Sequence, residues 1–295
     1  MLLSEGFSLF YQYADSISLL MLSAVGLMII FGMMGVINMA HGELMFIGAY
    51  TTSLVFYAGG PLFMAIPAGA LAAGAFGVVL ERLIIRRFYG QLLSSLVVTW
   101  GMSLLLGQGF LLVIGPSIRS LPTPFGSFSV GAFTYSYYRL FMLAVALVLV
   151  GGIWALLRFT KFGIEARATM ENPKMAHALG INVDKIYMLT FGLGAALAGI
   201  AGSLFALQSP IEPTFGRNYT PIAFITVVVG GSADIVAGLV ASTLSLSAIR
   251  TIFTSRFNIL IGQVSMLVAA FVFIRFVPNG MSEFLEFIRT RRNRV

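Results

Sequence analysis

The chain has 295 residues, of which 58% are hydrophobic and only 10% are charged, and its formal net charge is +7. A soluble domain carries about 25% charged residues, so the composition excludes an ordinary soluble protein and predicts a membrane protein with several spans. The chain contains no cysteine, which excludes disulfides and thiolate metal sites, and its two histidines argue against a His-rich metal centre.

Continuous apolar runs divide the chain into hydrophobic segments. Because these runs do not alternate with polar residues, they predict helices and not a closed β-barrel. The N-terminus lacks a basic leader followed by a small-residue cleavage site, so we expect the first segment to be retained. We predict an all-α, polytopic transmembrane bundle that forms one domain over residues 1–295. Its segments lie at roughly 17–36, 43–58, 61–84, 92–115, 139–158, 186–208, 221–249 and 258–277.

Basic residues near the segment ends indicate which connectors are cytoplasmic, and they explain the net charge without nucleic-acid binding. The connectors 81–90 and 158–185 and the tail 289–295 carry Arg or Lys and are expected in the cytoplasm. The connector 116–138 is rich in aromatics and is expected to be an ordered loop at the opposite interface. Eight simple crossings would leave the tail outside. A break at Gly230–Gly231, followed by a turn back, predicts a discontinuous helix and a cytoplasmic tail.

Small residues repeat at every fourth position in two of the segments. Such stripes let helix backbones approach closely in lipid, where packing replaces the hydrophobic driving force. We therefore predict tight packing of these helices. The stripes are Gly69, Ala73 and Gly77 in the third segment, and Gly194, Ala198 and Gly202, with Ala195, Gly199 and Ser203 beside them, in the sixth.

The sequence has few groups that could carry out chemistry. The Walker A, G-x-S-x-G and H-E-x-x-H motifs are absent from it. The ionisable residues within or beside apolar segments are Asp15, His41, Glu43, Asp234 and Arg250. This set lacks the nucleophile–base pair that an intramembrane hydrolase needs, so it favours transport or a structural role over catalysis.

The stretch NMAHGE (38–43) places ionisable groups between two apolar segments. It is either a short cytoplasmic turn with solvated side chains or a helix break that directs polar groups into a cavity. Intramembrane ionisable residues mark solute pathways, and interrupted segments in corresponding positions of two halves point to a transporter site. The stretch GGSAD (230–234) is the second such segment. The candidate path residues are Asn38, His41, Gly42, Glu43, Gly230, Gly231, Ser232 and Asp234.

The polar stretch 163–182 contains Asn172-Pro173, which predicts a short helix that is interrupted and restarted there. Ala176, Ala178 and Leu179 supply an apolar face that ends at Gly180. The stretch is either an ordinary amphipathic loop or a docking helix that fits a groove on a partner protein.

Three stretches, at 26–50, 167–204 and 223–240, occur in an order that resembles one family. It is the family of integral membrane permease subunits of bacterial ABC importers for branched-chain amino acids, urea and short-chain amides. The similarity covers most of the chain. The third stretch differs from the family pattern, because SADIVAG stands where members usually have a second glycine-rich step.

The resemblance implies a multi-pass permease of the bacterial inner membrane that pairs with a second, related permease subunit. It also implies two ATP-binding subunits on the cytoplasmic face, which bind ATP and Mg, and an extracytoplasmic solute-binding protein. This chain itself would hold no cofactor. The path residues carried over from the family are Asn38, His41, Gly42, Glu43, Gly230 and Gly231. The residues carried over to ATPase coupling, in a loop at about 159–185, are Glu165, Arg167, Asn172, Ala176, Gly180 and Ile181.

The mechanism implied by the resemblance is alternating access, in which closure of the ATPases rocks the two permease subunits against each other. Branched-chain amino acids are the default solutes, with urea or short amides as the other option. A rival hypothesis is a stand-alone channel or secondary carrier for a small neutral solute, for which 163–182 would be an indifferent loop.

Overall fold

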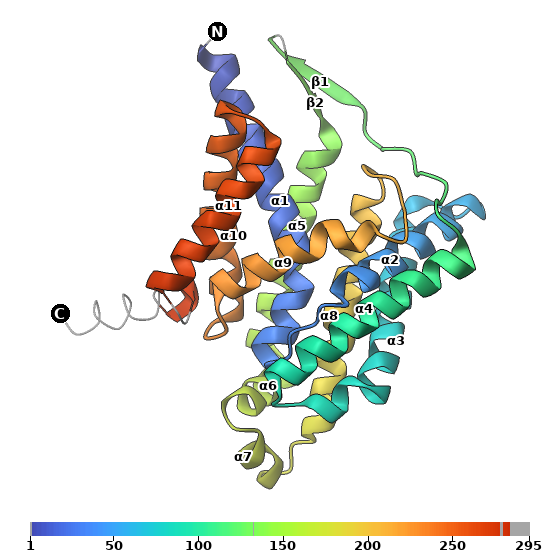
Figure 1. Cartoon of the computed structure of the whole chain (residues 1–295), viewed down its shortest axis with the longest axis vertical. Helices are drawn as coiled ribbons and strands as arrows, with labels where there is room; N and C mark the ends of the chain where they lie inside the picture. Colours follow the sequence, from blue (N-terminus) through green and yellow to red (C-terminus); the bar gives the residue numbers. More distant parts are fainter. Residues whose placement is uncertain (1, 132, 278–279, 284–295) are drawn as a thin grey trace, which may run out of the picture. The chain divides into compact units, whose positions relative to one another are not determined.

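The computed structural model describes residues 2–131, 133–277 and 280–283, and these residues are mostly helical (Figure 1). Among the helices of these described residues, seven are long and apolar enough to cross a membrane. This confirms the predicted polytopic helical bundle. The elements are α1 Leu2–Met34, α2 His41–Tyr57, α3 Leu62–Leu83, the 3-10 helix η1 Ile85–Phe88, α4 Leu92–Ile114, β1 Ser127–Val130, β2 Phe133–Ser136, α5 Tyr137–Phe159, α6 Lys161–Glu171, α7 Pro173–Ala178, α8 Val183–Phe205, α9 Phe215–Gly230, α10 Ile235–Arg256 and α11 Ile259–Phe276.

The seventh predicted segment, 221–249, is divided into two helices. The helix α9 ends at Gly230, α10 begins at Ile235, and the two run in different directions (Figure 1). The predicted discontinuous helix is therefore confirmed. The turn back to a cytoplasmic tail stays a prediction, because the tail 289–295 lies outside the described residues. The first segment was predicted too short, since α1 begins at Leu2 and not near residue 17.

Contacts within the chain define two compact units, and each is discontinuous in sequence. Residues 25–122 and 152–222 form what we call the internal unit. Residues 1–24, 123–151 and 223–295 form what we call the terminal unit. That the whole chain acts as one domain stays a prediction.

The core of the internal unit is built by α2, α3 and α8, which pack through their small residues. A Cβ atom built on Gly199 of α8 would lie 2.6 Å from the Cβ of Ala73 in α3. One built on Gly69 would lie 2.6 Å from Thr52 Oγ1 of α2. Real Cβ atoms do not approach other atoms so closely, so the backbones meet only because these positions lack side chains. The tight packing predicted from the stripes is confirmed.

The terminal unit contains a β-hairpin that the sequence reading missed. The strands β1 and β2 pair antiparallel with Ser127 opposite Ser136. Tyr11 of α1 holds the hairpin, because its hydroxyl donates to the Ser136 carbonyl at 2.8 Å and accepts from the Ser136 N–H at 3.0 Å. The centroids of the Tyr135 and Tyr11 rings are 4.6 Å apart. Part of the connector 116–138 is thus ordered as two strands, and its place at the non-cytoplasmic interface stays a prediction.

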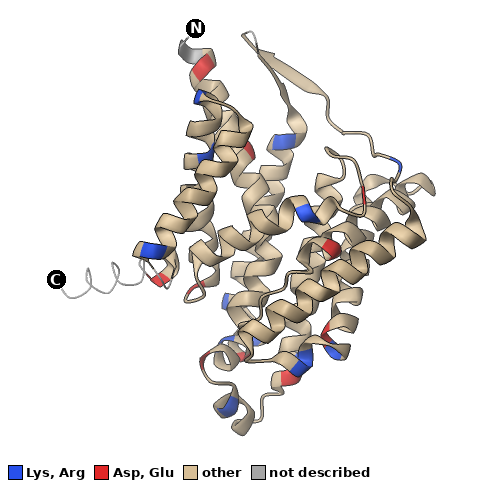
Figure 2. Cartoon of the chain, in the orientation of Figure 1, with Lys and Arg blue, Asp and Glu red and all other residues tan. Residues whose placement is uncertain are grey.

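Charged residues gather in one part of the internal unit. Figure 2 shows them on η1, α6, α7 and the adjoining ends of α3 and α8, whereas α4 and most of α8 carry few. These elements belong to the connectors 81–90 and 158–185, which are expected in the cytoplasm. The arrangement separates an apolar, membrane-spanning body from a charged end that can meet soluble partners.

Candidate functional site

The first break lies in the internal unit, where residues 35–40 separate α1 from α2. Gly35 follows the last turn of α1 with a φ of 61°, a conformation that favours glycine. The Asn38 side chain then accepts the N–H of Ala40 at 3.1 Å, and α2 begins at the next residue, His41. An asparagine in this role shapes a tight turn that starts a helix.

The polar side chains at this break are buried. Asn38, His41 and Glu43 are exposed by only 2%, 0% and 4%. A solvated cytoplasmic turn would leave them accessible, so their burial favours the helix break over that alternative. Burying polar groups in an apolar protein costs free energy unless they find partners, so the partners decide what the break can do.

Thr99 of α4 supports the break by binding its backbone. Its hydroxyl accepts the N–H of Met39 at 3.0 Å and lies 3.0 Å from the carbonyl of Ile37. The same hydroxyl lies 2.8 Å from the Ser95 carbonyl of its own helix. Backbone groups outside a helix need such partners at membrane depth, where water is scarce. The sequence reading missed Thr99, because nothing local marks a threonine that is 60 residues from its partner.

Glu43 is the acidic group of the break, and its two oxygens differ. Oε1 accepts a hydrogen bond from Ser103 of α4 at 2.7 Å. Oε2 is buried and has no hydrogen-bond partner among the described residues. The guanidinium of Arg217 in α9 lies nearby, since a Cβ built on Gly107 would be 3.8 Å from its Nη2 and 4.0 Å from Glu43 Oε1. Ser103 and Arg217 are therefore site residues that the sequence reading missed.

Asn38 leaves a second polar atom free. Its Nδ2 is buried and has no hydrogen-bond partner among the described residues. A spare donor on Asn38 and a spare acceptor on Glu43 can each be satisfied by water or by a polar solute. The break can therefore offer polar groups to a small zwitterion or amide without carrying a cluster of charges.

Gly42 has a packing role at the same break. A Cβ built on it would lie 2.6 Å from both the Cα and the carbonyl carbon of Gly216, at the start of α9. The beginnings of α2 and α9 thus cross in backbone contact. This crossing brings Arg217, one residue further along α9, towards the carboxylate of Glu43.

The second break, at 231–234, lies in the terminal unit. Gly231 has a φ of 78°, and a Cβ built on Gly280 would lie 2.6 Å from the Gly231 nitrogen. Asp234 caps α10, because its Oδ1 accepts the N–H groups of Val236 and Ala237 at 3.0 and 2.9 Å. Ser232 and Asp234 are both exposed. The helix cap accounts for Asp234, and that the two breaks form one path stays a prediction.

The predicted coupling residues lie on α6, α7 and the turn after them. As predicted, α6 ends at Glu171, and Asn172 starts α7 by accepting the N–H of Met175 at 3.0 Å. Gly180 ends this segment with a φ of 87°. The structure places Glu165 and Arg167 on α6 and Asn172, Gly180 and Ile181 at the ends of α7, with Ala176 within it.

Burial on α7 differs from the predicted apolar face. Ala176 is only 1% exposed and faces the protein, whereas Met175 and Leu179 are 58% and 74% exposed. One large apolar side chain on the six-residue helix α7, Met175, and one directly after it, Leu179, are thus available to a partner. Leu179 was part of the predicted face, and Met175 was missed. The sequence could have predicted that both share one face, because residues four positions apart are neighbours on the surface of a helix.

The connector between α3 and α4 makes an ion pair with the start of α8 and a hydrogen bond to the end of α3. Arg86 of η1 pairs with Asp184 at the start of α8. Tyr89, after η1, donates a hydrogen bond to Glu81. Burial, followed by that hydrogen bond, raises the pKa of the Tyr89 hydroxyl, so it stays protonated at neutral pH.

Within the described part of the chain, no three His, Cys, Asp or Glu side chains come together as a candidate metal site.

Comparisons with known proteins give one consistent result. A family model described as "Branched-chain amino acid transport system / permease component" matches residues 9–277. The high-affinity branched-chain amino acid transport system permease protein BraD of Pseudomonas aeruginosa is 31% identical over 240 residues, which cover 76% of this chain and 78% of BraD. The corresponding protein LivH of Escherichia coli K12 is 31% identical over 238 residues, 74% of this chain and 77% of LivH.

A shorter match extends the comparison to an archaeon. The probable branched-chain amino acid transport permease protein LivH of Methanocaldococcus jannaschii is 33% identical over 144 residues, which cover 47% of this chain and 46% of the relative. No solved structure gives a significant match.

Proposed function

This chain belongs to the family of permease components of branched-chain amino acid transport systems, and from this membership we propose that it is a transmembrane subunit of an ABC importer. It is a multi-pass protein of the bacterial inner membrane. We propose branched-chain amino acids as its solutes, as the printed names of its relatives suggest. Urea or a short amide is the alternative.

Beside family membership, the structural observation that supports this proposal is the exposed apolar surface of α7 and of Leu179 directly after it. Met175 and Leu179 are apolar and open to a partner, and Asn172 and Gly180 fix the ends of the helix. The sequence has no Walker A motif, so energy from ATP must come from other subunits. A short helix that inserts apolar anchors, flanked by charge, into a groove is a common way to dock two proteins.

The importer would need three kinds of partner. A second permease subunit completes the pathway, two ATPase subunits bind ATP and Mg below α6 and α7, and a solute-binding protein delivers solute from outside. Closure of the ATPases would pull α7 and rock the two permease subunits, which exposes the pathway to one side at a time. Asn38, His41, Gly42 and Glu43 are proposed to line this pathway, with Gly230, Gly231, Ser232 and Asp234 at the second break.

The rival proposal is a stand-alone channel or carrier for a small neutral solute. It requires no partner at α7, and it predicts solute flux through the chain alone. Reconstitution into liposomes separates the two proposals. Leucine uptake that needs both ATP and the ATPase subunits supports the importer, whereas flux through the chain by itself overturns it.

Two variants test the docking surface directly. Met175→Glu and Leu179→Glu together should abolish co-purification of the ATPase subunits, because each places a charge in an apolar contact. Phe133→Glu is the matched control, since Phe133 is also a large exposed apolar residue but lies on the β-hairpin. Unchanged co-purification with the double variant would overturn the docking assignment.

A further inference from the structure

A polar cavity of about 410 Å³ lies within the terminal unit. It is bordered by α1, by the start of α5, by the end of α10 and by the start of α11. Such a volume is sufficient for a small organic solute. The residues that give it its character are Asp15, Ser16, Arg139, Arg250, Thr251 and Thr254.

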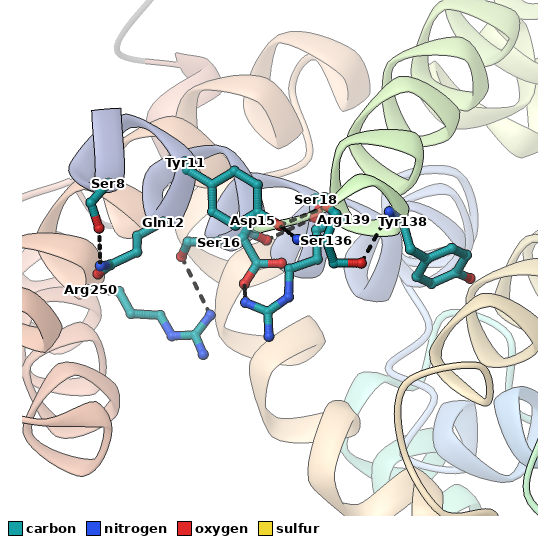
Figure 3. A network of polar contacts seen from close by, with 10 residues as sticks. All are labelled: Ser8, Tyr11, Gln12, Asp15, Ser16, Ser18, Ser136, Tyr138, Arg139 and Arg250. Carbon is teal, nitrogen blue, oxygen red and sulfur yellow. Dashed lines mark hydrogen bonds and ion pairs between the residues drawn. The ribbon is translucent and has the colours of Figure 1, made fainter. Parts of the chain in front are cut away.

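The cavity holds two positive charges and one negative charge. Arg139 donates to the Asp15 carboxylate at 2.9 Å, so these two charges are paired (Figure 3). Arg250 has only a long hydrogen bond, of 3.4 Å from Nη1 to Ser16 Oγ, and no carboxylate lies within ion-pair distance of it among the described residues (Figure 3). The guanidinium of Arg250 thus makes no direct contact with a carboxylate, although it lies within electrostatic range of Asp15.

Two threonines beside Arg250 have spare hydroxyl groups. The Oγ1 atoms of Thr251 and Thr254 are buried and have no hydrogen-bond partner among the described residues, and Thr251 is only 6% exposed. A helical threonine usually bonds the carbonyl of the preceding turn, so free hydroxyls at two such positions are unusual. The Thr254 hydroxyl lies against Gly262 of α11, since a Cβ built on Gly262 would lie 1.9 Å from Thr254 Oγ1.

These groups together match one ligand chemistry. A guanidinium binds a carboxylate with two parallel hydrogen bonds, and hydroxyl groups next to it can donate to the same oxygens. Asp15 uses one oxygen for Arg139, and its second oxygen can accept from an ammonium group. The α-amino and α-carboxylate groups of an amino acid carry these two charges. Urea and neutral amides lack the carboxylate.

The position of the cavity suits solute that arrives from outside. It borders the start of α5, which follows the connector 116–138, and that connector is expected on the non-cytoplasmic side of the membrane. Nothing at the two helix breaks requires Asp15, Arg139 or Arg250.

We infer that this cavity is a binding site for the α-carboxylate of the transported solute, with Arg250 as its main ligand and Thr251 as a hydrogen-bond donor beside it. The inference rests on the proposed importer function and selects amino acids over urea and amides within it.

The test uses the complete reconstituted importer with its binding protein and radiolabelled leucine. Arg250→Gln should lower ATP-driven uptake at least about tenfold, because the variant loses the charge that meets the carboxylate. Arg250→Lys should restore part of the uptake, and Thr251→Val should lower it about threefold. The control is Arg256→Gln, since Arg256 is an exposed arginine of α10 that does not border the cavity.

Stimulation of ATP hydrolysis by the binding protein and co-purification of all subunits should be unchanged in each variant. If Arg250→Gln loses either, Arg250 binds an acidic side chain of a partner subunit and the inference is overturned. Equal leucine uptake by Arg250→Gln and Arg256→Gln would overturn it as well. Failure of the unsubstituted importer to take up leucine would instead overturn the proposed function, so the two failures are distinguishable.

Discussion

The two helix breaks look alike in sequence and differ in structure. Both combine glycine with polar residues inside an apolar stretch. At 35–40 the polar side chains are buried, and Asn38 and Glu43 each keep a polar atom free. At 231–234 the acidic group caps the next helix and Ser232 is exposed. Only the first break combines burial with unused hydrogen-bonding capacity, which is the property that a solute path needs.

This difference shows what a break signal does and does not specify. Glycine and asparagine stop a helix because of their own backbone preferences, and these are local. Whether the freed polar groups meet solvent, a cap or a cavity depends on which helix covers them. For Glu43 that cover comes from Ser103 of α4, and for Gly42 it comes from Gly216 of α9.

The largest expected effect is at the backbone crossing of the first break. Gly42→Val should lower the free energy of unfolding by about 3 kcal/mol or more, because the new side chain would overlap Gly216 and overpacking of a tight contact is costly. The midpoint of thermal unfolding in detergent measures this. The control is Gly109→Val on α4, where a Cβ would meet no atom within 4 Å. Equal midpoints for the two variants would contradict the crossing.

An intermediate effect is expected at Thr99. Thr99→Val keeps the shape of the side chain but leaves the N–H of Met39 without its acceptor, which should cost about 1–3 kcal/mol. The control is Thr190→Val, because the Thr190 hydroxyl bonds the Ile186 carbonyl of its own helix, at 2.8 Å. If thermal unfolding showed both variants to be equally stable, Thr99 would not be what holds the break.

The smallest effect is expected when the acidic group of each break is neutralised. This pair of variants compares the two breaks most directly. Glu43→Gln keeps the hydrogen bond to Ser103 but removes the charge, and should lower ATP-driven uptake about tenfold, or about 1.4 kcal/mol. Asp234→Asn should leave uptake within about twofold, since asparagine caps a helix as well as aspartate does. Uptake is measured per assembled complex. A larger loss with Asp234→Asn would reverse the roles of the two breaks.

Much of the fold was predictable because its signals are local. The helix breaks follow from Gly230–Gly231 and Asn172-Pro173, and close packing follows from the stripe around Gly199. The start of α1 was missed because Gln12 and Asp15 make its N-terminal part too polar for a hydrophobic segment. The helix can include Asp15 because its carboxylate pairs with Arg139, which lies 124 positions later in the sequence.

The candidate site was only partly predictable. His41 and Glu43 stood out as ionisable residues in an apolar stretch, and the structure buries both. Their surroundings could not be predicted, because Ser103 and Arg217 come from helices far away in sequence. The hairpin was missed for another reason. The alternation of SFSV was present in the sequence, but four residues surrounded by glycine and proline resemble an ordinary loop.

The length of α1 has a consequence for depth in the bilayer. Its 33 residues correspond to about 50 Å, at about 1.5 Å per residue, whereas the hydrocarbon layer is about 30 Å thick. From Ser16 to Met34 the helix has no charged side chain, and this part alone nearly spans that layer. An upright α1 therefore places Asp15 near the lipid headgroups, with the preceding turns above them. At that level water can reach the ion pair with Arg139, and the cost of its charges falls.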